Sequence, residues 1–303
     1  MIYLFVLLFS IFSCALIRKT FIKHGLLDKI NHRSSHNVNA TRTGGLVLFS
    51  ILFLYTTYLY FSGFQPYDFS ILIPISILFA TGLYDDLYRV DFGLKFIFQI
   101  ITAKILLDMG YVIDIFSILG FEFTFTRTIS QIVTIVLYVG IFNAYNFIDG
   151  IDLNIFLETL KNISIMMFLF TFSIALNELI IITFIVIASI IPFNLNNKHK
   201  VFMGDSGSLI LPILLIFFLN QGVSISDDQN IIKYILVIFI YPLSDLIRVI
   251  IIRLKNKRSP FKADKSHIHH FIDNKLNNHF KSSFVIFIST LSIQYILILV
   301  FKL

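Results

Sequence analysis

Carboxylate side chains occur as an adjacent pair at the end of an apolar stretch. Asp85 and Asp86 directly follow the run 69–84. Two neighbouring carboxylates repel each other unless a cation or a proton offsets their charge. Carboxylate oxygens suit Mg²⁺, which binds a few of them together with water and phosphate oxygens. The pair is therefore a candidate cation site, although a solvated charge pair that merely ends a helix would have the same sequence.

A second polar set repeats every three residues. Asn143, Asn146, Asp149 and Asp152 share this spacing, which on a helix forms one slanted row. At the end of an apolar segment, such a row indicates a polar cavity rather than contact with lipid. A helix cap with exposed polar residues is the alternative, and the regular spacing makes it the weaker one.

A third segment, Gly204-Asp205-Ser206-Gly207-Ser208, opens another apolar run. Small residues with free N–H groups at a helix N-terminus can hold a phosphate, and Asp205 could bind a metal that bridges phosphate oxygens. An ordinary N-cap turn uses the same residue types. The neighbouring Phe202 could stack on a base, or simply anchor a helix at a membrane interface.

Histidines gather in the most basic segment, 251–282, as His267, His269 and His270. Together with lysine, histidine suits a polyphosphate because it adds directed donors to positive charge. A zinc site is the alternative, but neither the spacing nor an accompanying cysteine supports it. Cys14 is the single cysteine of the chain, so a disulfide framework is excluded.

The elements that position these residues are long apolar runs. The chain has 303 residues, of which 57% are hydrophobic and 14% charged. A bilayer span needs about 20 apolar residues in a helix, and the runs lack the alternation of barrel strands. We therefore predict an all-α polytopic transmembrane bundle, forming one domain over 1–303. Its ten expected spans are 1–17, 45–63, 69–84, 94–108, 129–145, 162–177, 179–193, 208–221, 231–250 and 283–301.

Positive charge assigns the sides of the membrane. Arg18 and Lys19 follow the first run, which places the N-terminus outside; ten spans then place the C-terminus outside as well. Six Lys and Arg residues lie in 18–44 and eight in 251–282, whereas the outside loops contain only Arg127. The net charge of +6 thus reflects topology rather than nucleic-acid binding, and the polar segments all fall on the cytoplasmic side. We also expect a tight turn at Asn177-Glu178 and a short hairpin within 109–128.

Taken in order along 25–273, these segments resemble the polyprenyl-phosphate N-acetylhexosamine-1-phosphate transferases of glycosyltransferase family 4. The resemblance implies an enzyme of the inner (plasma) membrane that depends on Mg²⁺ or Mn²⁺. It would transfer an N-acetylhexosamine-1-phosphate from a UDP-sugar to undecaprenyl phosphate, release UMP and so initiate a cell-envelope polysaccharide such as O-antigen. The oligomeric state stays open, a homodimer included.

The resemblance also implies roles for individual residues. Asp85 and Asp86 match the paired catalytic aspartates, with Asp85 beside the lipid phosphate, and Asp205 matches the metal ligand. Asp149 and Asp152, with Asn146, match the segment that lines the nucleotide-sugar site. The remaining substrate-binding positions would be Lys95 near the phosphates, Asn194 and Phe202 at uracil, and His267, His269 and His270 at the diphosphate or sugar.

Two departures from the family pattern concern loop geometry. The stretch 39–45 lacks the prolines that usually precede the glycine pair, and Leu153-Asn154 stands where the family usually has Gly-Leu. The sugar is left open as well, because 33–36 looks like the initiators that use deoxy-amino sugars and 266–270 like the N-acetylglucosamine group.

A secondary transporter is the main rival reading, because intramembrane acidic and amide residues often mark ion pathways. A transporter would place them near mid-span on discontinuous helices. Here they lie at one predicted face, which favours the enzyme. A purely structural membrane protein would have no need for these motifs on one side.

Overall fold

The computed structural model describes residues 2–28, 39–118, 120–196, 198–226, 230–259 and 266–303. The 33–36 and 260–265 stretches of the predicted loops lie outside these residues. The long helices are α1 (Ile2–Lys23), α2 (Gly44–Phe61), α3 (Leu72–Tyr88), α4 (Phe92–Asp108), α5 (Arg127–Phe147), α6 (Asn154–Leu169), α7 (Ile174–Asn194), α8 (Gly204–Ile225), α9 (Ile231–Lys255) and α11 (His279–Phe301). The short elements are α10 (Ile268–Leu276), the 3₁₀ turn η1 (Phe69–Ile71) and the strands β1 (Ala40–Arg42), β2 (Ile115–Ile118), β3 (Phe121–Thr124) and β4 (Lys200–Phe202).

The helical bundle confirms the predicted fold class. Eight of the described helices are long and apolar enough to cross a membrane. The two other predicted spans are also helical, but α4 has 17 residues and α6 has 16, which is short for a bilayer. The protein is therefore a multi-pass membrane protein.

The predicted break between 162–177 and 179–193 is wrong. The chain leaves the helix at 170–173, and Asn177 and Glu178 lie in the first turns of α7. Both side chains have partners there: the Asn177 amide donates to the Phe172 carbonyl at 3.2 Å, and Glu178 accepts from the Tyr55 hydroxyl at 3.1 Å. Polar residues with such partners do not need a turn.

Helix α8 is the most buried element and forms the centre of the bundle. Two glycines allow neighbouring helices to reach its first turn. A Cβ on Gly45 of α2 would lie 2.1 Å from the Gly207 nitrogen, and one on Gly82 of α3 would lie 2.4 Å from the Asp205 carbonyl oxygen. The backbones of α2 and α3 therefore contact the start of α8 directly, as close helix approach requires.

A buried ion pair lies inside the bundle on α6. Glu158 and Lys161 of α6 pair at 2.6 Å, and both side chains are 2% exposed. Lys161 also donates to the Thr290 hydroxyl of α11 at 2.5 Å. The neighbouring Asn162 connects Tyr145 of α5 to Gln294 of α11. Each of these residues makes at least one hydrogen bond, although Gln294 Oε1 has no partner within the described residues.

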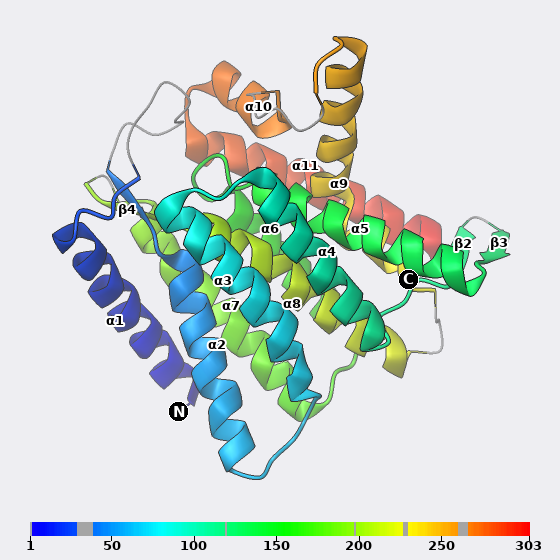
Figure 1. Cartoon of the computed structure of the whole chain (residues 1–303), viewed down its shortest axis with the longest axis horizontal. Coiled ribbons are helices and arrows are strands. Elements are labelled where there is room, and N and C mark those ends of the chain that lie inside the picture. Colours follow the sequence, from blue (N-terminus) through cyan, green and yellow to red (C-terminus); the bar gives the residue numbers. More distant parts are fainter. Residues whose placement is uncertain (1, 29–38, 119, 197, 227–229, 260–265) are drawn as a thin grey trace.

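The short elements β1, β4 and α10 lie at one end of the bundle, which we call the loop face (Figure 1). Strands β1 and β4 pair in parallel, with Arg42 opposite Phe202. Away from this face, β2 and β3 pair in antiparallel order, which confirms the predicted hairpin within 109–128. The loop face therefore brings together segments that are about 160 residues apart in the sequence.

Candidate active site

Two aspartates share one lysine at the loop face. Asp85 ends α3, Asp205 starts α8, and Lys95 lies in the first turn of α4. The Lys95 ammonium donates to Asp85 Oδ2 at 3.0 Å and also to Asp205 Oδ2. The two carboxylates stay partly exposed, at 18% and 23%. The structure thus brings together three residues that sequence reasoning singled out in three separate segments.

Asp86 has a different environment from Asp85. Its Oδ1 accepts the Asp205 backbone N–H at 2.9 Å, and its Oδ2 accepts that of Ser206 at 3.0 Å. The side chain is 1% exposed and lies 3.7 Å from the Arg42 guanidinium. Asp86 therefore caps the N-terminus of α8 and satisfies the free N–H groups there.

The polar row of α5 continues beyond its helix. Because α5 ends at Phe147, only Asn143 and Asn146 belong to the helical row that the spacing of three predicted; Asp149 and Asp152 lie in the connection 148–153. Asn143 pairs with Gln99 of α4, and Asn146 donates to the Ser208 hydroxyl at 2.7 Å. The row therefore ties α5 to both α4 and α8.

Asp149 lies beside the paired aspartates and accepts the Gly204 backbone N–H. Burial and the negative charges of Asp205 and Asp86 raise the pKa of its carboxyl well above the usual value, against the opposing effect of Arg42. Any cation that reaches Asp205 would therefore also favour the ionised form of Asp149.

Asp152 points to another part of the loop face. Its Oδ2 pairs with His279 Nδ1 at 2.9 Å and accepts a bond from Lys200 of β4. Burial raises the pKa of Asp152, but hydrogen bonds from His279 and Lys200, with their charge, hold it below the usual value. Its Oδ1 is buried and has no hydrogen-bond partner within the described residues. Asp152 thus contacts α11 and β4 instead of the Asp85–Asp205 pair.

The histidines lie against the 148–153 connection. His269 is fully buried, and its Nε2 is 2.2 Å from where a Cβ on Gly150 would lie. Neither of its ring nitrogens has a hydrogen-bond partner in the part of the chain that the structure describes. Burial, and then the neighbouring His270 and His267, lower the pKa of His269 well below the usual value, so that its ring is neutral.

Sequence reasoning missed the group that holds these histidines. Asp245 of α9 pairs with His267 Nδ1 at 2.9 Å and accepts the Ile268 N–H at 3.0 Å, which caps α10. Arg248 donates to the same aspartate at 2.7 Å. The available signal was an Asp and an Arg three residues apart within an apolar run, a spacing that allows them to pair on one helix face.

Asn194 and Phe202 occupy different parts of the site. Asn194 is 1% exposed, and its amide accepts from the Leu153 N–H at 2.9 Å and donates to the Val201 carbonyl at 3.0 Å. Leu153 has a φ of +68°, a conformation that glycine adopts most readily. The amide of Asn194 thus holds the loop in the left-handed geometry despite the leucine. Phe202 is half-buried in β4.

The donor set around Asp85 and Asp205 fits a hard divalent cation. Within the described residues, no three His, Cys, Asp or Glu side chains form a group that could hold a metal ion by themselves. Mg²⁺ is commonly bound by one or two carboxylates, with water and substrate phosphates as the other ligands. The two partly exposed carboxylates meet that requirement.

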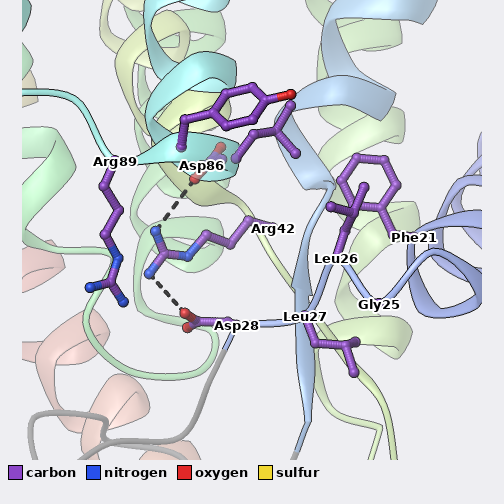
Figure 2. Close-up of a pocket in the computed structure, with 10 residues that line it drawn as sticks. Phe21, Gly25, Leu26, Leu27, Asp28, Arg42, Asp86 and Arg89 are labelled. Carbon is purple, nitrogen blue, oxygen red and sulfur yellow. Dashed lines mark hydrogen bonds and ion pairs between the residues drawn. The ribbon is translucent and has the colours of Figure 1, made fainter.

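Two cavities adjoin these residues. One is an apolar groove of about 280 Å³ between α4, α5 and α9, lined by Phe92, Phe96, Gly140 and Leu246 among others. The other, of about 430 Å³, lies between the end of α1, β1 and the end of α3, and includes Arg42, Asp86 and Arg89 in its lining (Figure 2). The Asp85–Lys95 pair thus has an apolar cavity near one side and a polar cavity near the other.

The sequence comparisons name the class of protein to which this multi-pass bundle, with its acidic residues and shared lysine at one face, belongs. The family model described as glycosyl transferase family 4 matches residues 69–223, which hold the paired aspartates, the polar row and the Asp205 segment. The chain belongs to this family. Membership in a transferase family favours the enzyme over the transporter.

Curated relatives cover most of the chain. The undecaprenyl-phosphate alpha-N-acetylglucosaminyl 1-phosphate transferase of Escherichia coli K12 is 30% identical over 294 residues, which is 89% of this chain and 74% of the relative. The protein of the same name from Salmonella typhimurium is 29% identical over 286 residues, or 88% and 74%. A probable undecaprenyl-phosphate N-acetylglucosaminyl 1-phosphate transferase of Bacillus subtilis is 29% identical over 265 residues, or 84% and 72%.

Proposed function

We propose that this protein transfers an N-acetylhexosamine-1-phosphate from a UDP-sugar to undecaprenyl phosphate, releasing UMP and forming undecaprenyl-diphosphate-linked sugar. The observation that carries the proposal is the pair of partly exposed carboxylates, Asp85 and Asp205, that share Lys95 where α3, α4 and α8 meet at the loop face. The names of the relatives agree with this reaction. N-acetylglucosamine is the first sugar to test, because these relatives carry it in their names.

The apolar groove between α4, α5 and α9 would take the hydrocarbon chain of the acceptor. Its lining residues Phe92 and Phe96 flank Lys95 on α4. A chain lying in the groove would therefore end near the Lys95 ammonium. Burial of hydrocarbon contributes about 0.8 kcal/mol for each CH₂ group, so the groove can supply affinity while the lysine meets the phosphate.

The connection 148–153 would meet the donor. Asp152 Oδ1 and both ring nitrogens of His269 are buried polar atoms without partners in the described chain. Such atoms carry a free-energy penalty that a hydrogen-bonding ligand removes. A nucleotide sugar offers hydroxyl and imide donors for the carboxylate, and Phe202 of β4 supplies an aromatic ring nearby.

Mg²⁺ would be held by Asp205 and Asp85, and when bound it would offset the negative charge of the reacting phosphates. The acceptor phosphate oxygen forms a bond to the sugar-bearing phosphorus of the donor, and the bond from that phosphorus to the bridging oxygen of UMP breaks. Lys95 would hold the acceptor phosphate close to this phosphorus by offsetting the repulsion between two anions. Asp149 and Asp86 would keep the start of α8 in position.

The same proposal includes location. The described parts of the Lys- and Arg-rich segments 18–44 and 251–282 include β1 and α10, which lie at the loop face. By the positive-inside rule this face would lie in the cytoplasm, with the protein in the inner (plasma) membrane. Both proposed substrates, a nucleotide sugar and a lipid anchored in the inner leaflet, are compatible with that side.

The test is UMP release by purified protein in detergent with undecaprenyl phosphate and a panel of UDP-sugars: N-acetylglucosamine, its 4-epimer and their 6-deoxy derivatives. We expect turnover that requires Mg²⁺ or Mn²⁺, stops with EDTA and falls by roughly a hundredfold or more in Asp205→Asn. Lys255→Gln, which removes an exposed charge at the C-terminal end of α9, serves as the control. Full activity of Asp205→Asn with the metal chelated would refute the proposed mechanism.

A further inference from the structure

The cavity between the end of α1, β1 and the end of α3 contains an arginine that the proposed reaction does not yet use. Arg89 lines this cavity together with Arg42 and Asp86. In Figure 2 its side chain extends on the opposite side of Arg42 from Phe21 and Leu26. The cavity therefore has charged groups on one wall and apolar residues of the α1 end on another.

The charges of the cavity are balanced except at Arg89. Arg42 donates to Asp28 at 3.0 Å and lies 3.7 Å from Asp86. Asp86 also receives the two N–H groups at the start of α8. The Arg89 guanidinium, in contrast, takes part in no hydrogen bond or ion pair among the described residues. An exposed guanidinium that lines a cavity and has no partner among the described residues can take an anion as its partner.

The backbone at Arg89 is unusual. Its φ is +59° and its ψ is 105°, outside the helical region, directly after the last turn of α3. For a residue with a Cβ this conformation is strained, and strain of this kind concentrates at functional sites. Glycine would fit this position without strain. The conformation directs the arginine into the cavity while its N–H still closes the helix on the Asp85 carbonyl at 3.0 Å.

Arg89 also has a fixed relation to the acidic pair. Asp85 and Asp86 lie in the turn that it terminates, and Asp85 Oδ1 accepts the N–H of the following Val90 at 2.7 Å. Movement of Arg89 is thus coupled to the segment that carries Asp85. An anion held at Arg89 would lie next to the carboxylates that the reaction is proposed to use.

We propose that Arg89, with Arg42 beside it, forms a phosphate-binding subsite in this cavity that receives a phosphate group of one of the two substrates next to Asp85 and Asp205. Guanidinium groups match phosphate oxygens in a bidentate geometry that lysine cannot provide. The inference rests on the proposed function for the identity of the substrates, whereas the presence of a phosphate subsite can be measured without turnover. General retention of arginine at an anionic membrane surface would require neither the cavity nor the strained backbone.

The decisive variant is Arg89→Gly, because glycine keeps the observed backbone conformation and removes only the side chain. The first measurement is the thermal stability of the detergent-purified protein with increasing inorganic pyrophosphate. We expect pyrophosphate to stabilise the wild type, and Arg89→Gly to need about tenfold more of it, as the loss of one charge-assisted contact implies. Lys255→Gln should respond like the wild type. An equal response of Arg89→Gly and wild type, or no response of either, overturns the proposal.

The second measurement assigns the phosphate. KM for undecaprenyl phosphate and KM for the UDP-sugar are measured separately in the wild type, Arg89→Gly and Arg89→Lys. An increase of about tenfold in one KM, with kcat changed much less, identifies the substrate whose phosphate binds, and Arg89→Lys should recover only part of it. Unchanged values of both KM overturn the proposal. A wild type that turns over no UDP-sugar refutes the proposed function alone, since the pyrophosphate measurement still decides the subsite.

Discussion

The Asp86 carboxylate accepts the backbone N–H of Asp205 at 2.9 Å. Asp86, at the end of α3, therefore holds the first turn of α8, the helix that carries Asp205. Cap residues of this kind contribute about 1 kcal/mol, and a negative charge at a helix N-terminus adds to it. The adjacent aspartates Asp85 and Asp86 therefore have separate tasks: Asp85 pairs with Lys95, and Asp86 holds the backbone at the start of α8.

This division predicts different effects of the two amide substitutions. Asp86→Asn should lower the melting temperature by several degrees and reduce transfer, because the start of α8 loses its charged cap and Asp205 moves with it. Asp85→Asn should reduce transfer with a smaller effect on melting temperature. Thermal unfolding in detergent, measured beside UMP release, separates them. Equal melting temperatures for Asp86→Asn and the wild type would contradict the capping role.

The glycine contact between α3 and α8 can be tested by stability alone. Gly82→Ala would place a Cβ 2.4 Å from the Asp205 carbonyl oxygen, and overpacking of this kind costs about 1–3 kcal/mol. Gly140→Ala is the matched control, because nothing lies within 4 Å of its added Cβ and alanine favours a helix interior by roughly 0.5–1 kcal/mol over glycine. The two variants should shift the melting temperature in opposite directions, and a shift in the same direction would argue against the close contact.

The buried pair of α6 predicts a non-additive double variant. Lys161→Met leaves Glu158 without its cation inside the bundle and should destabilise the protein by about 3–5 kcal/mol. Glu158→Gln combined with Lys161→Met removes both charges and should recover part of that loss. Denaturation in detergent for the two single variants and the double variant gives the coupling. A double variant that is less stable than either single variant would show that the charges do not act as a pair.

Asp152 predicts a pH-dependent contribution to stability. Its folded pKa lies below the usual value of 3.8, because hydrogen bonds to His279 and Lys200 outweigh the effect of burial. Ionised Asp152 therefore stabilises the fold above that usual value, and the stabilisation disappears as the pH falls through the lower folded pKa. Asp152→Asn should melt several degrees below the wild type from pH 7 to 5, with the gap closing below about pH 4.

The exposed Asp114 provides the control for that experiment, since Asp114→Asn removes a charge without changing these contacts. A gap between Asp152→Asn and the wild type that widens as the pH falls would show the opposite linkage, with the carboxylate destabilising the native state.

Hydropathy and charge were sufficient to predict the helical bundle, because a bilayer span has a fixed length and composition. They were insufficient for the turn between α6 and α7. The run 162–193 is mostly apolar, and the polar Asn177 and Glu178 suggested a break that their partners Phe172 and Tyr55 make unnecessary. Hydropathy registers that a residue is polar, but it contains no information about a partner such as Tyr55, which is 123 residues from Glu178.

The candidate site was likewise predicted only in part from the sequence. Asp85, Lys95 and Asp205 were identified as residues, yet the sequence could not indicate that one lysine joins both carboxylates. Asp245 was missed because it lies within an apolar run, where its link to His267 depends on how α9 and α10 meet. Arg89 was not singled out because its proposed role is argued from a backbone conformation, which residue type alone does not predict.

The pairing of β1 with β4 also determines when the protein can first work during its synthesis. Residue 42 leaves the ribosome 160 residues before its partner residue 202. At roughly 5–20 residues per second, that separation corresponds to about ten to thirty seconds of translation. During this interval the helices made first are already synthesised, but β1 has no strand to pair with. A chain that stops before β4 would therefore carry Asp85 and Lys95 but lack both the strand that pairs with β1 and Asp205 of α8.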